Sequence, residues 1–263
     1  MSQRRGFRLG VAQSPAELTG VAERLAWLDD LLSRNGHHHA DLLVLPELFA
    51  TGYNAAPLIN AHAEPKDGPI AQQMAALCTK HQTAIVYGYP EAEGGQIYNA
   101  AQALDADGKS LGHHRKLAIP PGFERQMFAP GQGINGFDFR GVHCAILICY
   151  DAEFPETARQ AAANGAEVLI VPTALGADWG WVAGQMIPTR GFENGVYLAY
   201  ANSAGVENSL RYLGQSVIAA PDGRELARAA QEPTVLVAEI DPAKVSAAQQ
   251  RLPYLIDRLS LQF

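Results

Sequence analysis

The sequence predicts an α/β protein in which helices lie outside the sheets. Short apolar segments such as residues 41–45 alternate along the chain with longer segments of helical periodicity. Strands that are apolar without interruption are typical of a sheet covered on both faces. Turn sequences at residues 105–108 and 221–223 predict hairpins, so the sheets should contain antiparallel as well as parallel pairs.

The first half of the chain should alternate strands with two helices. The segments that predict strands are residues 7–13, 41–45, 83–89, 98–104 and 110–117. Apolar side chains share one face of a helix expected over residues 18–32: Leu18, Val21, Leu25, Leu28 and Leu32. A second helix is expected over residues 70–82, with three side chains turned inward: Met74, Leu77 and Cys78.

The second half begins with an irregular segment. Residues 117–136 contain Pro120, Pro121 and Pro130, and loops of this length in a compact domain are usually functional. Strands are expected further on at residues 142–149, 168–171, 196–201, 214–220 and 235–240. Helices are expected at residues 155–164, at 181–194 with an interruption at Pro188, and from residue 241 onward.

The chain should form one domain. No linker rich in Pro, Gly or Ser divides residues 1–263, although a C-terminal tail is expected from about residue 252. A chain of this length can bury about 70–75% of the surface that it exposes when unfolded, so stability needs no disulfide or metal. Hydrophobic residues make up 48% and charged residues 18%, which excludes an intrinsically disordered chain.

Charge and composition exclude several classes of partner. The net charge is −7 and the basic residues are scattered, whereas a nucleic-acid-binding protein should show a basic stripe. No run of about 18 apolar residues occurs, so no membrane-spanning helix is expected. The first residues lack the apolar core of a secretory signal. Three cysteines cannot all pair with one another, and this odd number predicts a cytoplasmic protein with free thiols.

Cys149 is the first candidate for catalysis. It ends the most apolar expected strand, and a helix is expected about six residues later. A thiol that faces a helix N-terminus is well placed to act as a nucleophile, and a buried structural cysteine is the alternative. Cys144 lies within the same strand and Cys78 on an apolar helix face, so both are expected to be inert.

The histidines offer no convincing partner for a cysteine nucleophile. The run His37-His38-His39 is interpreted as an exposed loop, and adjacent residues do not easily face one ion, so no metal site is predicted. His113 and His114 point to opposite faces of one strand. No Gly-x-Cys-x-Gly or Gly-x-Ser-x-Gly sequence is present, which disfavours a Cys/His hydrolase.

Three charged residues stand close to apolar segments. Glu47 follows the strand at 41–45, Lys116 lies at the end of the strand at 110–117, and Glu124 lies in the irregular segment. Each alone is typical of a solvated charge at a strand end. Together with Cys149 they supply what attack on a carboxamide needs: a nucleophile, a group that accepts and returns a proton, and positive charge where the oxygen becomes negative.

Four motifs stand in order along nearly the whole chain: Leu45-Pro-Glu47, His114-Arg-Lys116, Cys149-Tyr-Asp151 with Phe154-Pro-Glu156, and Arg190-Gly-Phe-Glu-Asn194 followed by Asn202 and Gly205. Together they resemble the motifs of the carbon–nitrogen hydrolase (nitrilase) superfamily. The resemblance implies a four-layer α-β-β-α sandwich, with two mixed sheets packed face to face. A single doubly wound sheet would contradict this expectation.

The resemblance also implies a role for each matched residue. Glu47 would be the general base for Cys149, Lys116 would stabilise the oxyanion together with the backbone N–H of Tyr150, and Glu124 would orient the substrate. The reaction would pass through a thioester and would need no metal or organic cofactor. The irregular segment must then fold back to bring Glu124 to the thiol.

The residues after the cysteine indicate a branch of the superfamily. Tyr150-Asp151 follows Cys149 where true nitrilases carry Trp-Glu, so an amidase that acts on small carboxamides is predicted. A nitrilase, an N-carbamoyl amine hydrolase and a non-catalytic binding relative are the alternatives. Many relatives have Arg in place of Glu153, which is interpreted either as an acidic edge of the pocket or as a carboxylate favoured by the helix dipole.

Further substrate-binding residues are expected near the strand ends. Tyr53 closely follows Glu47, and Thr173 and Ala174 follow a buried strand, where sites of open α/β sheets form. Trp179 is expected either as a pocket wall or as a packing or dimer contact. The expected partners are a small-molecule amide and further copies of the chain in a homodimer or higher homo-oligomer, without nucleic acid or membrane.

Overall fold

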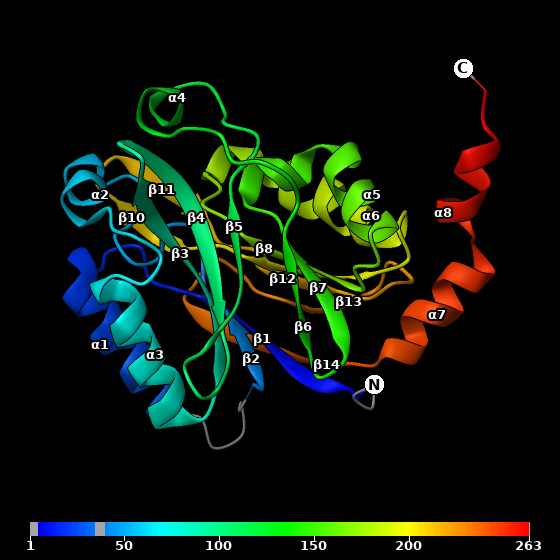
Figure 1. The fold of residues 1–263 in the computed structure, drawn as a ribbon, viewed down its shortest axis with the longest axis horizontal. Coiled ribbons are helices and arrows are strands. Elements are labelled where there is room, and N and C mark those ends of the chain that lie inside the picture. The colour runs from blue at the N-terminus through cyan, green and yellow to red at the C-terminus, as the bar shows by residue number, and fades with distance from the viewer. Residues whose placement is uncertain (1–4, 35–39, 263) are drawn as a thin grey trace.

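The computed structural model describes residues 5–34 and 40–262. Two six-stranded mixed sheets pack face to face, and helices cover both outer faces, so the fold is the four-layer α-β-β-α sandwich that the motifs implied (Figure 1). The first sheet has the spatial order β14 (Thr234–Ile240), β1 (Phe7–Gln13), β2 (Leu42–Val44), β3 (Ala84–Glu93), β4 (Gln96–Leu104) and β5 (Ser110–Arg115). The second has the order β13 (Glu225–Arg228), β12 (Val217–Ala219), β9 (Tyr197–Ala201), β8 (Val168–Pro172), β7 (Val142–Ile146) and β6 (Gly136–Phe139).

The remaining elements connect or cover these sheets. A separate two-stranded ribbon consists of β10 (Ala204–Glu207) and β11 (Leu210–Leu213). The α-helices are α1 (Gly20–Ser33), α2 (Ala56–His62), α3 (Pro69–His81), α4 (Phe123–Met127), α5 (Pro155–Ala163), α6 (Ile187–Phe192), α7 (Pro242–Arg251) and α8 (Tyr254–Asp257). No helix in the described part of the chain is long and apolar enough to cross a membrane.

The pairing within each sheet is mixed, as the turn sequences predicted. In the first sheet β2 lies parallel to β1 and β3, whereas β4 is antiparallel to both of its neighbours. The β4–β5 hairpin turns through Asp105, whose carboxylate accepts hydrogen bonds from the backbone N–H groups of Asp107 and Lys109. Gly108 completes this turn with a φ of 79°, a conformation that glycine adopts at low cost.

Alternating side chains explain why β2 is apolar throughout. Leu42 and Val44 belong to the core between the two sheets. Leu43 belongs to a second core, which contains the apolar faces of α1 and α3. Because successive side chains of a strand point to opposite faces, a strand that is covered on both sides must be apolar at every position.

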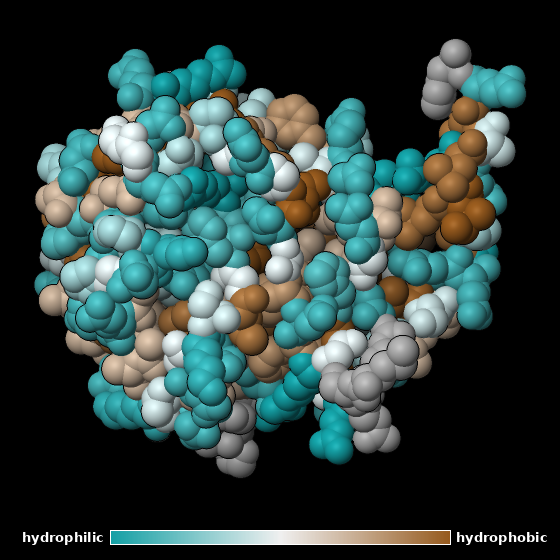
Figure 2. All heavy atoms as spheres, in the orientation of Figure 1, coloured by the Kyte–Doolittle hydropathy of each residue, from teal (hydrophilic) through white to brown (hydrophobic). Residues whose placement is uncertain are grey.

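The outer face of the second sheet is covered by α5 and α6, and the chain then ends in an arm. Ala158, Ala161 and Ile187 from these two helices join the central core. After α7, the helix α8 touches α5 through part of its surface, and the chain then projects at the C-terminus (Figure 1). Figure 2 shows apolar side chains gathered on this arm.

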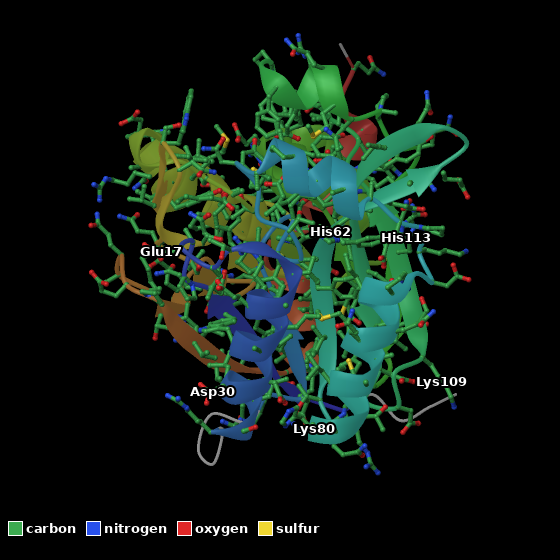
Figure 3. The ribbon with its side chains drawn as sticks, turned by 90° about the vertical axis from the view of Figure 1, so that its left-hand side faces the viewer. Glu17, Asp30, His62, Lys80, Lys109 and His113 are labelled. Atoms are coloured by element: carbon green, nitrogen blue, oxygen red, sulfur yellow. The ribbon has the colours of Figure 1, made fainter. Side chains whose placement is uncertain are left out.

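The outer face of the first sheet is covered by α1 and α3, which lie side by side (Figure 3). Their apolar faces contain residues that the periodicity predicted, including Leu25, Leu28 and Met74. Near one end of the pair, the Lys80 ammonium contacts the Asp29 carboxylate at 2.7 Å. Both side chains are largely exposed, so this ion pair contributes at most about 1 kcal/mol, and the helices are held mainly by their apolar faces.

Two expectations about local structure were wrong. The strand expected over residues 142–149 ends at Ile146, because parallel pairing with β8 stops there and the chain turns. Cys149 instead begins a turn of 3-10 helix, Cys149–Glu153. The expected irregular segment contains the short helix α4, and several elements of seven residues or fewer had no clear periodic signal: α2, β6, β10, β11 and β13.

Candidate active site

The ends of strands from both sheets bring the candidate residues together. Glu47 follows β2, Lys116 follows β5, and Thr173 follows β8, which packs against β2 across the interior. The backbone N–H of Glu47 donates to the Thr173 carbonyl at 3.3 Å, which ties the two sheets together at this point. Cys149 lies just beyond β7, the neighbour of β8 in the second sheet.

Lys116 binds two buried carboxylates. Its Nζ donates to Glu47 Oε1 at 2.6 Å and to the two oxygens of Glu124 at 2.9 and 2.8 Å. All three side chains are buried. Glu124 comes from α4, so the irregular segment does fold back and carry this carboxylate to the lysine.

The two oxygens of Glu47 have different surroundings. Oε1 accepts hydrogen bonds from Lys116 and, at 2.7 Å, from the side-chain amide of Asn99. Oε2 is buried and has no hydrogen-bond partner among the described residues. Burial raises the pKa of Glu47 to about 7, with the attraction of Lys116 opposing this rise and the charge of Glu124 adding to it.

Lys116 remains an ammonium in this buried setting. Burial by itself lowers the pKa of Lys116, but the negative charges of Glu47 and Glu124 outweigh that effect and hold the pKa above its usual value. The side chain therefore supplies a fixed positive charge at a position that water does not reach.

Cys149 occupies a strained turn. Its φ of 46° lies in the left-handed region, which residues other than glycine rarely adopt and which is enriched at functional sites. This turn forms without the flanking glycines of a Gly-x-Cys-x-Gly motif, so a search of the sequence for that motif could not find it. Burial raises the pKa of the Cys149 thiol and the charge of Glu47 raises it further, while Lys116 lowers it. The thiol is therefore neutral until a base removes its proton.

Asp151 joins the Cys149 turn to the end of β5. Its two carboxylate oxygens accept four hydrogen bonds between 2.7 and 3.1 Å, from the N–H groups of Leu117 and Ala118 and from Ile148 N–H and His114 Nε2. A buried carboxylate with this many donors is well compensated for its desolvation. Asp151 thus fixes the position of the thiol relative to that of Lys116.

Three of the predicted substrate-binding residues adjoin the buried group. The hydroxyl of Tyr53 donates to Glu124 Oε1 at 2.6 Å. Thr173 and Ala174 contact the Cys149 thiol, through the Thr173 hydroxyl and the backbone N–H of Ala174, and both contacts lower the pKa of that thiol.

The other three lie further out. Burial raises the pKa of the half-buried Glu153 carboxyl, and attraction to Lys116 and Arg190 opposes this rise. Glu153 therefore interacts electrostatically with the charged residues of the site. The ring of Tyr150 packs edge to face on Phe154, with 5.0 Å between centroids. Trp179 lies on the surface and is 61% exposed.

Two further site residues had only weak signals in the sequence. Asn99 interrupts an otherwise apolar part of β4, and a polar side chain at such a position needs a partner, which here is Glu47. Arg190 binds the carbonyl oxygens of Ala152 and Glu153, at 3.2 and 2.7 Å, and so braces the Cys149 turn. Its partners could not be identified from the sequence, because they lie more than 35 residues away.

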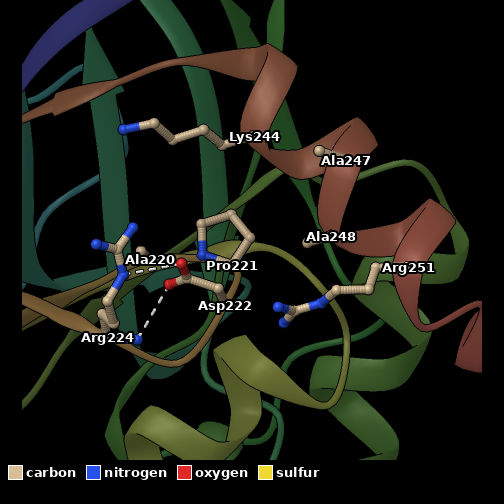
Figure 4. Close-up of a pocket in the computed structure, with 8 residues that line it drawn as sticks. All are labelled: Ala220, Pro221, Asp222, Arg224, Lys244, Ala247, Ala248 and Arg251. Carbon is tan, nitrogen blue, oxygen red and sulfur yellow. Dashed lines mark hydrogen bonds and ion pairs between the residues drawn. The ribbon is translucent and has the colours of Figure 1, made fainter.

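Other possible binding sites lie apart from this group. No cluster of three or more His, Cys, Asp or Glu suited to a metal occurs within residues 5–34 and 40–262, and the run His37–His39 lies outside these residues. Figure 4 shows a cavity of 210 Å³ between the β12–β13 turn and α7, which includes Asp222, Arg224 and Lys244 in its lining. The lining of this cavity contains no Cys, Ser or Thr, so the cavity does not replace the buried group as a candidate.

Comparisons with known proteins identify the family of this chain. A carbon–nitrogen hydrolase family model matches residues 8–250. A hydrolase of Pseudomonas protegens is 44% identical over 96% of this chain and 89% of its own length. An (R)-stereoselective amidase from a Pseudomonas species is 34% identical over 83% of this chain and 79% of its own.

The solved structures show the same fold. An amidase from Nesterenkonia sp. AN1 superposes with a TM-score of 0.84 at 31% identity, covering 97% of this chain and 100% of that one. In that structure acrylamide has added to the active-site cysteine. The family match spans nearly the whole chain and includes all four motifs, so the chain belongs to the carbon–nitrogen hydrolase family, within the nitrilase superfamily.

Proposed function

We propose that the chain is a cysteine-dependent amidase that cleaves the C–N bond of a small carboxamide to a carboxylate and ammonia through a thioester. The observation that carries this proposal is the unoccupied Oε2 of Glu47 in a site that also contains a neutral thiol and a fixed ammonium. The amidases among its relatives support an amide as the substrate. No cofactor takes part in the proposed reaction.

Acylation begins when the Cys149 sulfur attacks the amide carbon. Glu47 takes the thiol proton on Oε2, because Lys116 and Asn99 already occupy Oε1. The carbonyl π electrons move to oxygen, and the Lys116 ammonium and the Tyr150 backbone N–H stabilise that oxyanion. Glu124, with Tyr53 on its Oε1, orients the substrate amide.

Collapse of the tetrahedral intermediate breaks the C–N bond. Glu47 returns its proton to the departing nitrogen, so ammonia leaves and the acyl group remains on sulfur as a thioester. Water then attacks the thioester while Glu47 accepts a proton from it. The C–S bond breaks, the proton returns to the Cys149 sulfur, and the acid product ionises.

Carboxamides should be hydrolysed with a higher kcat/KM than the matching nitriles. An amide presents a carbonyl oxygen that becomes the oxyanion beside Lys116, and its leaving nitrogen takes the single proton that Glu47 holds. A nitrile must be protonated on nitrogen and needs a different proton route to a thioimidate. Ammonia release across matched amides, nitriles and carbamoyl amines would test this, and a higher kcat/KM for nitriles would overturn the amidase assignment.

Glu153→Gln should raise KM more for amides that bear a basic amine on the acyl side than for neutral amides. If the half-buried Glu153 carboxyl edges the substrate pocket, a substrate cation beside it would gain about 1–3 kcal/mol. Glu156→Gln is the matched control, because Glu156 is an exposed carboxylate in the first turn of α5. Equal effects of Glu153→Gln on both substrate types would return Glu153 to a helix-start role.

We also propose that the chain assembles with further copies of itself through the C-terminal arm. Three apolar side chains on the arm, Ile256, Leu259 and Leu261, are 69%, 70% and 60% exposed (Figure 2). Contiguous apolar surface of this kind usually marks an interface, and an arm exchanged between identical copies gives a closed, symmetric contact. We propose a cytosolic location for the protein, which its three free, buried cysteines support.

Deleting residues 254–263 should therefore shift the protein to a smaller assembly. Light scattering coupled to size-exclusion chromatography would measure the mass of the full-length and shortened proteins. Ile256→Ser with Leu259→Ser, which keeps the chain length, should have the same effect. A full-length protein that is already monomeric at micromolar concentration would contradict the proposal.

A further inference from the structure

Arg24 and Glu207 form a buried ion pair outside the catalytic group, and stabilisation of the fold alone does not explain it. Arg24 on α1 and Glu207 at the end of β10 are 183 residues apart, and their side chains meet at 3.0 Å with 2% and 9% exposure. Removing two charges from water costs about as much as their attraction returns, so a buried pair is weak evidence of stabilisation. The other contacts of Glu207 indicate what the pair does instead.

The carboxylate of Glu207 accepts hydrogen bonds from the loop that follows Glu47. Its Oε2 accepts hydrogen bonds from the backbone N–H groups of Tyr53 and Asn54, at 3.1 and 2.7 Å, and from the Tyr212 hydroxyl at 2.6 Å. Arg24 occupies Oε1. Only an ionised carboxylate accepts from so many donors without presenting a proton of its own.

The loop is shaped to reach this carboxylate. Gly52 has a φ of 90°, and a Cβ atom on it would lie 1.9 Å from Glu207 Oε1. Only glycine therefore allows the backbone to approach Glu207 in this conformation. The next residue, Tyr53, is fixed at both ends, since Glu207 binds its backbone N–H and Glu124 accepts its hydroxyl.

We propose that Glu207 is a positioning residue that sets Tyr53 against Glu124 in the active site. The connection runs from the Arg24–Glu207 pair through the backbone of Tyr53 to its hydroxyl, and from there to Glu124 and Lys116. The role rests on the proposed amidase function, in which Glu124 orients the substrate. A carboxylate misplaced by about 1 Å at such a position can cost about 100-fold in rate.

A double-mutant cycle on Glu207→Gln and Tyr53→Phe would test this role. Each single variant should lower kcat/KM for a small amide by about 10- to 100-fold. The double variant should be no slower than the slower single variant, because Glu207 acts through the Tyr53 hydroxyl. If the two effects instead multiply, Glu207 does not act through that hydroxyl and the proposal fails.

The matched control is Glu64→Gln. Glu64 is also a buried carboxylate that accepts from two backbone N–H groups, those of Ile70 and Ala71, but it serves the start of α3. Its variant should unfold at a lower temperature and keep kcat/KM within about twofold. A loss of kcat/KM equal to that of Glu207→Gln would mean that general destabilisation explains both.

Two further measurements allow the test to give a clear answer even if Glu207→Gln does not fold or the unaltered protein is inactive. If Glu207→Gln does not fold because Arg24 is left buried and unpaired, the variant Arg24→Gln with Glu207→Gln removes that charge and takes its place in the cycle. Ammonia release by the unaltered protein is measured first. A protein that hydrolyses no amide contradicts the proposed function, whereas an active protein with multiplicative effects contradicts only the role of Glu207.

Discussion

Cys149→Ala is expected to lower kcat for amide hydrolysis by about 10⁴-fold or more, with the fold intact. Alanine offers no nucleophile, so neither tetrahedral intermediate nor thioester can form. The thiol is neutral in the resting site, so its removal leaves no buried charge without a partner. Ammonia release would measure the rate, circular dichroism would check the fold, and intact-protein mass spectrometry would look for an acyl adduct on the unaltered protein alone.

Cys78→Ala provides the matched control for this substitution. Cys78 is also a free and buried thiol, but it packs on α3 within the core outside the first sheet. Its loss should reduce stability by about 1 kcal/mol and leave turnover unchanged. Appreciable hydrolysis by Cys149→Ala, or an equal loss in Cys78→Ala, would point to a nucleophile other than Cys149.

The fold could be predicted from sequence where a segment repeats its pattern over many residues. Helices α1 and α3 and strand β1 lie within two residues of their predicted bounds, because each presents a regular apolar face or an unbroken apolar run. The end of β7 could not be placed in this way, because Leu147 and Ile148 remain buried and apolar after strand pairing stops. What ends the strand is the turn at Cys149, and composition does not encode its positive φ.

The site was predictable only in part, and for a similar reason. Glu47 and Lys116 stand at the ends of apolar strands, where a charged residue is unusual enough to be noticed, and the resemblance to the family adds a role for Glu124. Asn99 and Glu207 were missed, because a polar residue within or beside a short strand is ordinary until its partner is known. Those partners lie 52 and 183 residues away along the chain, at Glu47 and Arg24.

The buried group of Glu47, Glu124 and Lys116 contains two carboxylates and one ammonium, and this imbalance bears on the acid–base behaviour of Glu47. Glu47 and Glu124 share the single ammonium of Lys116, which binds Glu124 through both oxygens and Glu47 through one. Burial raises the pKa of Glu47 to about 7, the charge of Glu124 adds to this rise, and the single contact with Lys116 offsets it only in part. A carboxylate with that pKa can both accept and return a proton near neutral pH, which the proposed reaction requires twice in each cycle.

Glu47→Gln is expected to lower kcat by about 10²- to 10⁴-fold, the usual contribution of a general base. Glutamine keeps the volume of the side chain and an oxygen that can accept from Lys116 and Asn99. Its NH₂ group, however, replaces Oε2, which has no partner in the resting site and is proposed to receive the thiol proton. Single-turnover measurements of ammonia release would locate the loss in the acylation step.

The pH profile should identify the same residue independently. The carboxyl of Glu47 is protonated below its pKa of about 7 and then cannot accept a proton, so kcat/KM should fall tenfold per pH unit below about pH 7 and level off above it. The residual rate of Glu47→Gln should not show this acidic limb. Glu93→Gln is the control, because the Glu93 side chain is 67% exposed, and this variant should keep both the rate and the acidic limb of the unaltered protein. A limb centred near pH 4 to 5 in the unaltered protein, or one that survives in Glu47→Gln, would assign the proton transfer to another group.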